Sequence, residues 1–193
     1  LGEKQLDIAP SGHRTCLYQT EQLESVLDQM AWQAAGFLAT KERVMIVGIL
    51  RRGAPLAEML HERLLRKCDL AHAELMHLKI KRYADDLTLL HPETQLTESP
   101  LQATLNLEHT TVLVVDYVMY HGHSMLRAVE YLARKQALEI RTAVLVDRGA
   151  NKLPVRVDIT GVRLDVAPSD IIECNVPPYE ASFKIDLLKP TEN

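Results

Sequence analysis

The strongest local signal in this sequence is VLVVDYVMYHGHSMLRA, residues 112–128. An apolar run ends on an acid, Asp116, a turn containing Gly122 follows, and Ser124 opens a helical pattern. A glycine in the turn lets the backbone close around an anion, and the amino end of a helix offers N–H groups and a favourable dipole. The stretch therefore predicts a phosphate-binding turn at Tyr120–Ser124. An ordinary strand–turn–helix in which Ser124 only caps the helix is the plain alternative. Neither the Walker glycine–lysine pattern nor the dinucleotide glycine spacing is present.

Other apolar runs alternate with helical patterns along the chain. Residues 44–50, 111–116 and 141–147 are short apolar runs typical of strands that are buried on both faces. The helical patterns are 20–38, with Thr20 as the expected cap, a stretch that begins after Gly53, and 125–135. Weaker strand patterns lie at 73–81, 155–159, 170–174 and 183–188. The order strand, helix, strand, helix, strand predicts an α/β fold around a central, mainly parallel sheet flanked by helices.

Three turns mark the expected site, because ligands of parallel sheets bind beyond the carboxyl ends of the strands. They are residues 51–53, 116–124 and 147–149. Residues 82–109 are polar and irregular, and we expect a flexible loop there, since so long a loop is more often functional than idle. Residues 1–19 lack a clear period and are expected to form a mobile lead-in. The whole chain of 193 residues has the length of a single domain.

Composition and charge argue against several classes of protein. The net charge of −4 disfavours coating by nucleic acid, which needs a concentrated basic surface. A local patch built from Arg51, Arg52, Lys79, Lys81 and Arg82 stays open. The three cysteines lie far apart without a Cys-x-x-Cys pair, which favours buried thiols in a reducing cytosol over disulfides or zinc. No apolar run has the length of a membrane span and no signal peptide opens the chain, so we expect a cytoplasmic protein without a membrane partner.

The stretch 112–128 resembles the phosphoribosyl-diphosphate (PRPP) motif of the type I phosphoribosyltransferases. Three further stretches resemble one branch of that family, the pyrimidine operon attenuator proteins that double as uracil phosphoribosyltransferases. They are the diphosphate loop IVGILRRGAPLAEML (46–60), the flexible-loop start KRYADDLT (81–88) and the base-side segment AVLVDRGANKLPVRVDITG (143–161). In order, the four stretches cover about residues 17–175. The resemblance implies the type I phosphoribosyltransferase fold with a small hood and a flexible loop, and a homodimer or higher homo-oligomer.

The resemblance also implies a role for each matching residue. Asp116 and Arg52 would be catalytic, the first holding a ribose hydroxyl of PRPP and the second neutralising the departing diphosphate. PRPP and phosphate contacts would come from Tyr117, Tyr120, His121, Gly122, His123 and Ser124. The diphosphate loop would be Arg51, Arg52 and Gly53, the base side Asp147, Arg148 and Gly149, and the flexible loop Arg82, Tyr83, Asp85 and Asp86. Mg²⁺ would arrive with PRPP, without a direct protein ligand, and a closed loop would keep water from the reactive sugar.

Three departures from the family pattern weaken the grip on PRPP. Tyr117 stands at the place of a second acid, and a phenol does not offer an anionic, two-oxygen contact. His121-Gly122-His123-Ser124 replaces Thr-Gly-Arg-Thr, and histidine loses most of arginine's charge at neutral pH. Ala84 stands where the flexible loop has an arginine. Tyr120 resembles the pyrimidine branch, because purine-salvage relatives carry an acid at that position.

Two functions of different classes follow from this comparison. The first is a phosphoribosyltransferase of pyrimidine metabolism that converts uracil and PRPP to UMP and diphosphate. The alternative is a catalytically weak or inactive nucleotide-sensing regulator of pyrimidine gene expression, with RNA as an open partner that the acidic net charge disfavours. A third hypothesis is a phosphorylated ligand that lacks the diphosphate and needs no second acid.

Several of these residues also have a plain structural explanation. His121 and His123 could begin a transition-metal site, but no third ligand is evident from the sequence, and polar loop residues near an anion would look the same. Arg51-Arg52 and Asp85-Asp86 could each be a solvated surface pair. Arg148 could belong to a surface turn, Cys174 is more typical of a buried thiol than of a nucleophile, and Trp32 is expected to pack in the core or at an interface.

Overall fold

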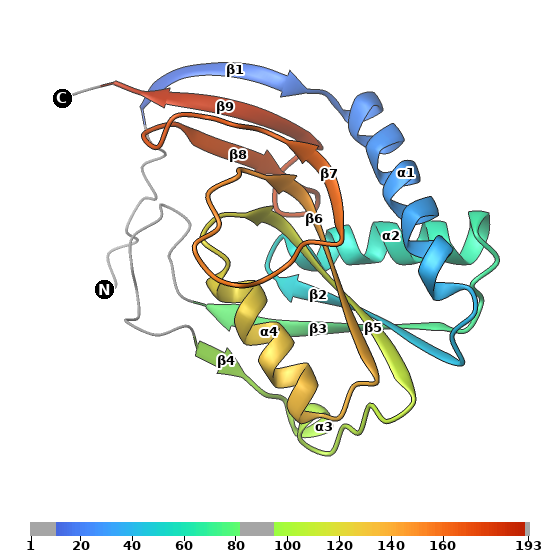
Figure 1. The fold of residues 1–193 in the computed structure, drawn as a ribbon. Coiled ribbons are helices and arrows are strands. Elements are labelled where there is room, and N and C mark those ends of the chain that lie inside the picture. The colour runs from blue at the N-terminus through green and yellow to red at the C-terminus, as the bar shows by residue number, and fades with distance from the viewer. Residues whose placement is uncertain (1–10, 82–94, 192–193) are drawn as a thin grey trace, which may run out of the picture.

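The structure of the protein, a computed structural model, describes residues 11–81 and 95–191, and its centre is a six-stranded sheet (Figure 1). The strand order is β4-β3-β2-β5-β6-β7. The strands are β2 (Arg43–Leu50), β3 (Ala73–Lys81), β4 (Gln95–Thr97), β5 (Thr110–Met119), β6 (Glu139–Asp147) and β7 (Ile159–Arg163). All neighbours pair in parallel except β3 and β4, which are antiparallel. The expected mainly parallel sheet is thereby confirmed.

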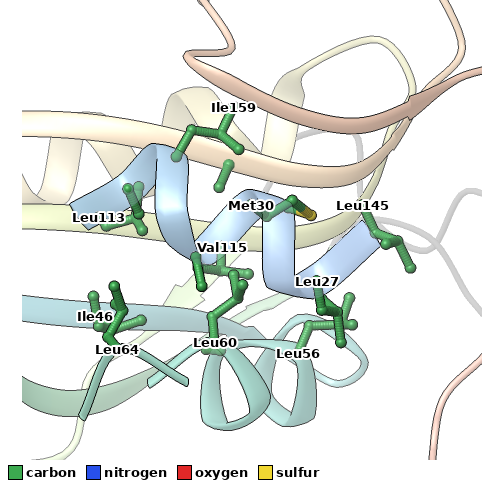
Figure 2. Close-up of a cluster of buried hydrophobic side chains, with 14 of the residues drawn as sticks. Leu27, Met30, Ile46, Leu56, Leu60, Leu64, Leu113, Val115, Leu145 and Ile159 are labelled. Atoms are coloured by element: carbon green, nitrogen blue, oxygen red, sulfur yellow. The ribbon is translucent and has the colours of Figure 1, made fainter. Parts of the chain in front are cut away.

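Alternating side chains of the central strands build two cores, one on each face of the sheet. The helices are α1 (Thr20–Leu38), α2 (Gly53–Lys67), the short α3 (Pro100–Ala103) and α4 (His123–Arg134). Figure 2 shows the first core, in which Leu27 of α1 and Leu60 of α2 pack with strand residues such as Ile46 and Leu113. Val47, the neighbour of Ile46, belongs to the second core together with residues of α4. Burial on both faces explains why these strands appear in the sequence as nearly continuous apolar runs.

A smaller antiparallel sheet in the order β1-β9-β8 forms the hood, at the top of Figure 1. Its strands are β1 (Gly12–Tyr18), β8 (Ile171–Asn175) and β9 (Lys184–Pro190). The prediction of a lead-in without secondary structure over residues 1–19 is therefore wrong for 12–18, which pair with β9. Most of β1 is exposed on both of its faces, so its sequence carries no apolar alternation. Ile172 and Ile185 of the hood enter the first core, and this packing holds the hood against the main sheet.

The start of α1 differs from the expectation that Thr20 caps it. Gln19 precedes the helix, and its N–H donates to Oε1 of Gln22 at 2.9 Å. Thr20 is instead the first helical residue, and its hydroxyl donates to the carbonyl oxygen of Phe183 at 2.8 Å. The threonine thus ties α1 to the segment before β9 rather than closing its own helix.

The expected loop over residues 82–109 contains regular structure in its described part. Residues 82–94 lie outside the described residues, whereas β4 and α3 fall within 95–109. Ser99 caps the start of α3, and its hydroxyl accepts the N–H of Gln102 at 3.3 Å. The strand predicted at 155–159 lies later, at Ile159–Arg163, after a segment in which Pro154 and Val155 belong to no element.

Candidate active site

The three turns predicted to form the site end three neighbouring strands, β2, β5 and β6. Gly53 begins α2 against the end of β5, where a Cβ atom would lie 2.8 Å from the Val115 carbonyl oxygen. The same Cβ would lie 3.1 Å from Oδ1 of Asp116. A glycine is therefore what allows the amino end of α2 to approach Asp116. This approach brings the 51–53 turn and the acid of the quoted stretch to one edge of the sheet.

Asp116 is buried, with 9% of its surface exposed. Its Oδ1 accepts the N–H of Tyr117 at 2.8 Å. Burial raises the pKa of the Asp116 carboxyl to about 7, against the smaller lowering effect of that hydrogen bond. Near neutral pH this carboxyl can therefore accept a hydrogen bond from a hydroxyl when ionised or donate one to it when protonated.

The phosphate turn has the geometry that its glycine predicts. Gly122 precedes α4 in the left-handed conformation, with φ of +98°, and a Cβ atom there would lie 2.6 Å from Oδ1 of Asn151. The helix begins at His123, two residues before the predicted start at 125, so Ser124 lies in its first turn. The N–H groups of a first turn have no carbonyl partner within their helix and are available to an anion.

The base-side turn lies against the phosphate turn. The N–H of Arg148 donates to the Met119 carbonyl oxygen at 3.3 Å. Its guanidinium carbon lies 4.9 Å from the centre of the Tyr120 ring, and Tyr120 stacks on His121 with ring centres 3.8 Å apart. Arg148 therefore packs on the ring of Tyr120 in the neighbouring turn. Gly149, at φ of +67°, closes this turn through its N–H, which donates to Oδ1 of Asp147 at 2.8 Å.

A cavity of about 480 Å³ opens between these two turns. Its lining includes Tyr120, His121, Arg148, Lys152 and Asp165. Sequence reasoning did not single out Lys152 or Asp165. Lys152 lies inside the base-side segment 143–161, so the motif could have predicted it. Asp165 follows β7 in a stretch without a motif, so the sequence carried no signal for it.

The two arginines before Gly53 face the connection between β8 and β9. Nε of Arg52 donates to Oε1 of Glu180 at 3.0 Å, and Nη2 of Arg52 donates to the same oxygen. The guanidinium carbon of Arg51 lies 4.8 Å from the centre of the Tyr179 ring. That of Arg52 lies 5.9 Å from the centre of the Tyr117 ring. Arg52 is therefore half-buried and ion-paired, whereas Arg51 is exposed and contacts the Tyr179 ring.

Tyr117 is half-buried and packs against the first core. Its phenol side chain therefore does not supply a second carboxylate beside Asp116. Among residues 11–81 and 95–191 no group of three or more His, Cys, Asp and Glu side chains lies close enough to hold a metal ion.

Cys174, Trp32 and the flexible-loop residues are the remaining candidates from the sequence. Burial raises the pKa of the Cys174 thiol to about 12, so it is neutral at pH 7 and does not supply a thiolate nucleophile. Trp32 is 61% exposed on α1, which contradicts core packing and leaves the interface as its expected place. The flexible-loop candidates Arg82, Tyr83, Asp85 and Asp86 lie outside the described residues. No helix in the described part of the chain is long and apolar enough to cross a membrane.

The strand order, the hood and the two turns beside Asp116 define a phosphoribosyltransferase scaffold. The family model for the phosphoribosyl transferase domain matches residues 13–182, and the chain belongs to this family. Solved structures of hypoxanthine phosphoribosyltransferases share the fold. One from Staphylococcus aureus has a TM-score of 0.70 at 17% identity and covers 91% of this chain and 93% of its own. One from Trypanosoma cruzi, in complex with the product IMP, has a TM-score of 0.69 at 14% identity, with 93% of this chain and 91% of its own covered.

Relatives named Bifunctional protein PyrR are more similar in sequence. The protein from Haemophilus ducreyi is 30% identical over 176 residues, which are 91% of this chain and 97% of the relative. The protein from Pasteurella multocida is 31% identical over 155 residues, which are 78% of this chain and 84% of the relative. The resemblance drawn from the four sequence stretches is thereby confirmed.

Proposed function

We propose that this chain binds a pyrimidine mononucleotide, UMP, between the phosphate turn and the base-side turn, and that it turns over PRPP weakly. The observation that carries the proposal is the side chain of Tyr117, the residue after Asp116, which is half-buried and packs against the first core. The edge of the sheet retains its anion-binding turn, but position 117 offers no second carboxylate to hold the ribose and magnesium of PRPP. Such a protein is suited to sensing a nucleotide.

The phosphate of UMP lies at the amino end of α4. Gly122 turns the backbone there, and the first N–H groups of the helix donate to the phosphate oxygens. The Ser124 hydroxyl and the His121 and His123 rings add donors from the same turn. A monophosphate needs no further anion site, which suits a turn with histidines in place of the arginine of the family.

The ribose and the base lie between Asp116 and the cavity of about 480 Å³. Asp116 bonds a ribose hydroxyl, and its pKa of about 7 lets it act as donor or acceptor. The base enters beside Tyr120 and Arg148, whose side chains already stack on each other. A tyrosine at position 120 favours a pyrimidine, because it offers no acid to handle the proton of a purine base.

A second candidate is the full reaction of uracil with Mg–PRPP. The bond from the anomeric carbon to diphosphate breaks, the bond to the uracil nitrogen forms, and the proton of that nitrogen is lost to solvent. The approach of Gly53 to Asp116 favours this candidate, because it sets Arg52 and the amino end of α2 beside the sugar. Magnesium, carried by the substrate, stabilises the charge of the leaving diphosphate.

Calorimetric titration of the purified protein with UMP and separately with Mg–PRPP tests the proposal. We expect UMP to bind and PRPP to bind at least about tenfold more weakly, which corresponds to roughly 1.4 kcal/mol. Mg–PRPP binding as tight as UMP binding, followed by rapid turnover of uracil, would replace the sensing function with the enzymatic one. Absence of UMP binding would refute both the nucleotide site and the regulator.

Three properties expected from the sequence stay predictions. A homodimer or higher oligomer is tested by sedimentation, cytoplasmic location by cell fractionation, and RNA binding by gel retardation at two salt concentrations. RNA binding would need a basic surface assembled across subunits, since the chain itself carries a net charge of −4.

A further inference from the structure

The connection between β8 and β9 contacts both arginines of the 51–53 turn. Glu180 accepts two N–H bonds from Arg52, one of them from Nε at 3.0 Å, and Tyr179 lies under the guanidinium of Arg51 at 4.8 Å. The pair joins residues that are 128 positions apart in the sequence. The hood thus reaches over the amino end of α2, where a substrate diphosphate would lie.

The Glu180 carboxylate is held from two sides. Its Oε2 accepts the N–H of Val176 at 2.8 Å, while Oε1 receives Arg52. The side chains of Arg52 and Glu180 are 18% and 23% exposed. A partly buried carboxylate with both oxygens fixed binds a guanidinium more strongly than a mobile surface carboxylate, because little conformational freedom remains to be lost.

We propose that Glu180 is a specificity-determining residue whose carboxylate occupies Arg52 in place of a diphosphate oxygen, so that the site favours monophosphate over diphosphate ligands. This inference rests on the proposed function, in which a monophosphate binds at the amino end of α4. A guanidinium bonds carboxylate and phosphate oxygens through the same pair of N–H groups, so the two compete for Arg52. A diphosphate must displace Glu180, whereas a monophosphate bound at α4 leaves the pair in place.

Tyr117 belongs to the same arrangement. Its ring centre lies 5.9 Å from the Arg52 guanidinium carbon. A tyrosine at this position stabilises the cation through its ring without adding a second carboxylate that would compete with Glu180. The departure from the family pattern and the hood contact therefore act on one arginine.

The test uses the full chain with Glu180→Gln and titrates inorganic diphosphate with Mg²⁺ and, separately, UMP. Glutamine keeps the oxygen that accepts the Val176 N–H, but it removes the charge that pairs with Arg52. We expect the Kd for diphosphate to fall about tenfold, because the amide NH2 of glutamine then faces Arg52 and cannot accept its N–H groups, and the Kd for UMP to change less than about twofold. Glu173→Gln is the matched control, because Glu173 makes the same kind of pair within the hood, with Arg14 at 2.8 Å.

A diphosphate Kd that is unchanged or higher in Glu180→Gln would overturn the proposal, because Glu180 would then only position Arg52. Failure to detect diphosphate binding in either protein would overturn it as well. Combining Glu180→Gln with Arg52→Gln must abolish the gain; a gain that persists would place the competition elsewhere. If Glu180→Gln does not fold, Glu180→Asp, whose side chain is one methylene shorter and pairs less closely with Arg52, should show a smaller gain, and no gain in that variant would overturn the proposal. Diphosphate binding is measured without UMP, so a protein that fails to bind UMP refutes the proposed function and leaves this test intact.

Discussion

A carbon atom added to Gly53 would lie 3.1 Å from Oδ1 of Asp116, so the start of α2 and the acid of β5 touch at backbone distance. This contact places the amino end of α2 directly against the buried carboxyl of Asp116. The site is therefore sensitive to changes of a single atom at position 53.

Gly53→Ala tests that contact. The new methyl group would meet the Val115 carbonyl oxygen at 2.8 Å, and backbone cannot move aside as a flexible side chain can. We expect a loss of about 1–3 kcal/mol in the free energy of unfolding, measured in urea, and weaker UMP binding. Gly36→Ala is the matched control, because nothing lies within 4 Å of its Cβ position. That control should raise stability by roughly 0.5–1 kcal/mol through helix propensity; equal effects of the two variants would contradict the argument.

Asp116 makes stability depend on pH. Its pKa is raised by burial to about 7 in the folded chain, against roughly 3.9 when unfolded. Between these values the folded state binds more protons than the unfolded state, so the free energy of unfolding falls as pH rises from about 4 to about 7. Asp116→Asn should remove that slope and become the more stable protein at pH 8 by roughly 1–4 kcal/mol. Parallel urea titrations from pH 4 to 8 check this, and identical slopes in both proteins would contradict it.

Tyr117→Asp combined with His121→Thr should restore part of the grip on PRPP. The aspartate adds a second carboxylate beside Asp116, and the threonine restores a compact hydroxyl to the phosphate turn. We expect Mg–PRPP to bind about tenfold more tightly by calorimetry, although the loss of Tyr117 packing should lower the melting temperature. His72→Thr, at an exposed histidine before β3, controls for the histidine change. Unchanged PRPP affinity would mean that the weakened site has another cause.

Gly122→Ala should weaken UMP binding while leaving the fold in place. Alanine at φ of +98° is strained, and its methyl group would lie 2.6 Å from Oδ1 of Asn151. The turn would have to open, so we expect the Kd for UMP to rise at least about tenfold, with a small decrease in melting temperature. Fluorescence or calorimetric titration measures it. An unchanged Kd for UMP in this variant would contradict the proposal that the phosphate binds at the amino end of α4.

The sequence predicts the main sheet well because burial on both faces leaves a readable signal. Residues 44–50 lie within β2 and 141–147 within β6, since nearly every side chain in them is apolar. The strand β1 escapes prediction because most of it is exposed on both faces. Local sequence patterns therefore predict strands that are buried on both faces. They miss an edge strand such as β1, whose formation depends on pairing with a segment far away in the sequence.

The site shows the same division. Asp116, Gly122 and Arg148 are predictable because the ends of neighbouring parallel strands converge in any fold of this kind. The pairing of Arg52 with Glu180 is not, since it links the 51–53 turn to a connection in the hood that carries no motif. Local sequence also gives no measure of desolvation, so the raised pKa of Asp116 emerges only once the β5 surroundings are known.

The pairing of β1 with β9 has a consequence for the order in which the chain folds. Ser11 and Thr191 meet although 180 positions separate them, so this sheet cannot close until residue 191 has left the ribosome. The parallel strands β2, β3, β5 and β6 are complete by residue 147 and can assemble earlier. During synthesis we therefore expect an interval in which the nucleotide edge is already folded while Arg52 still awaits Glu180, and nascent chains in that interval should be the most exposed to free diphosphate.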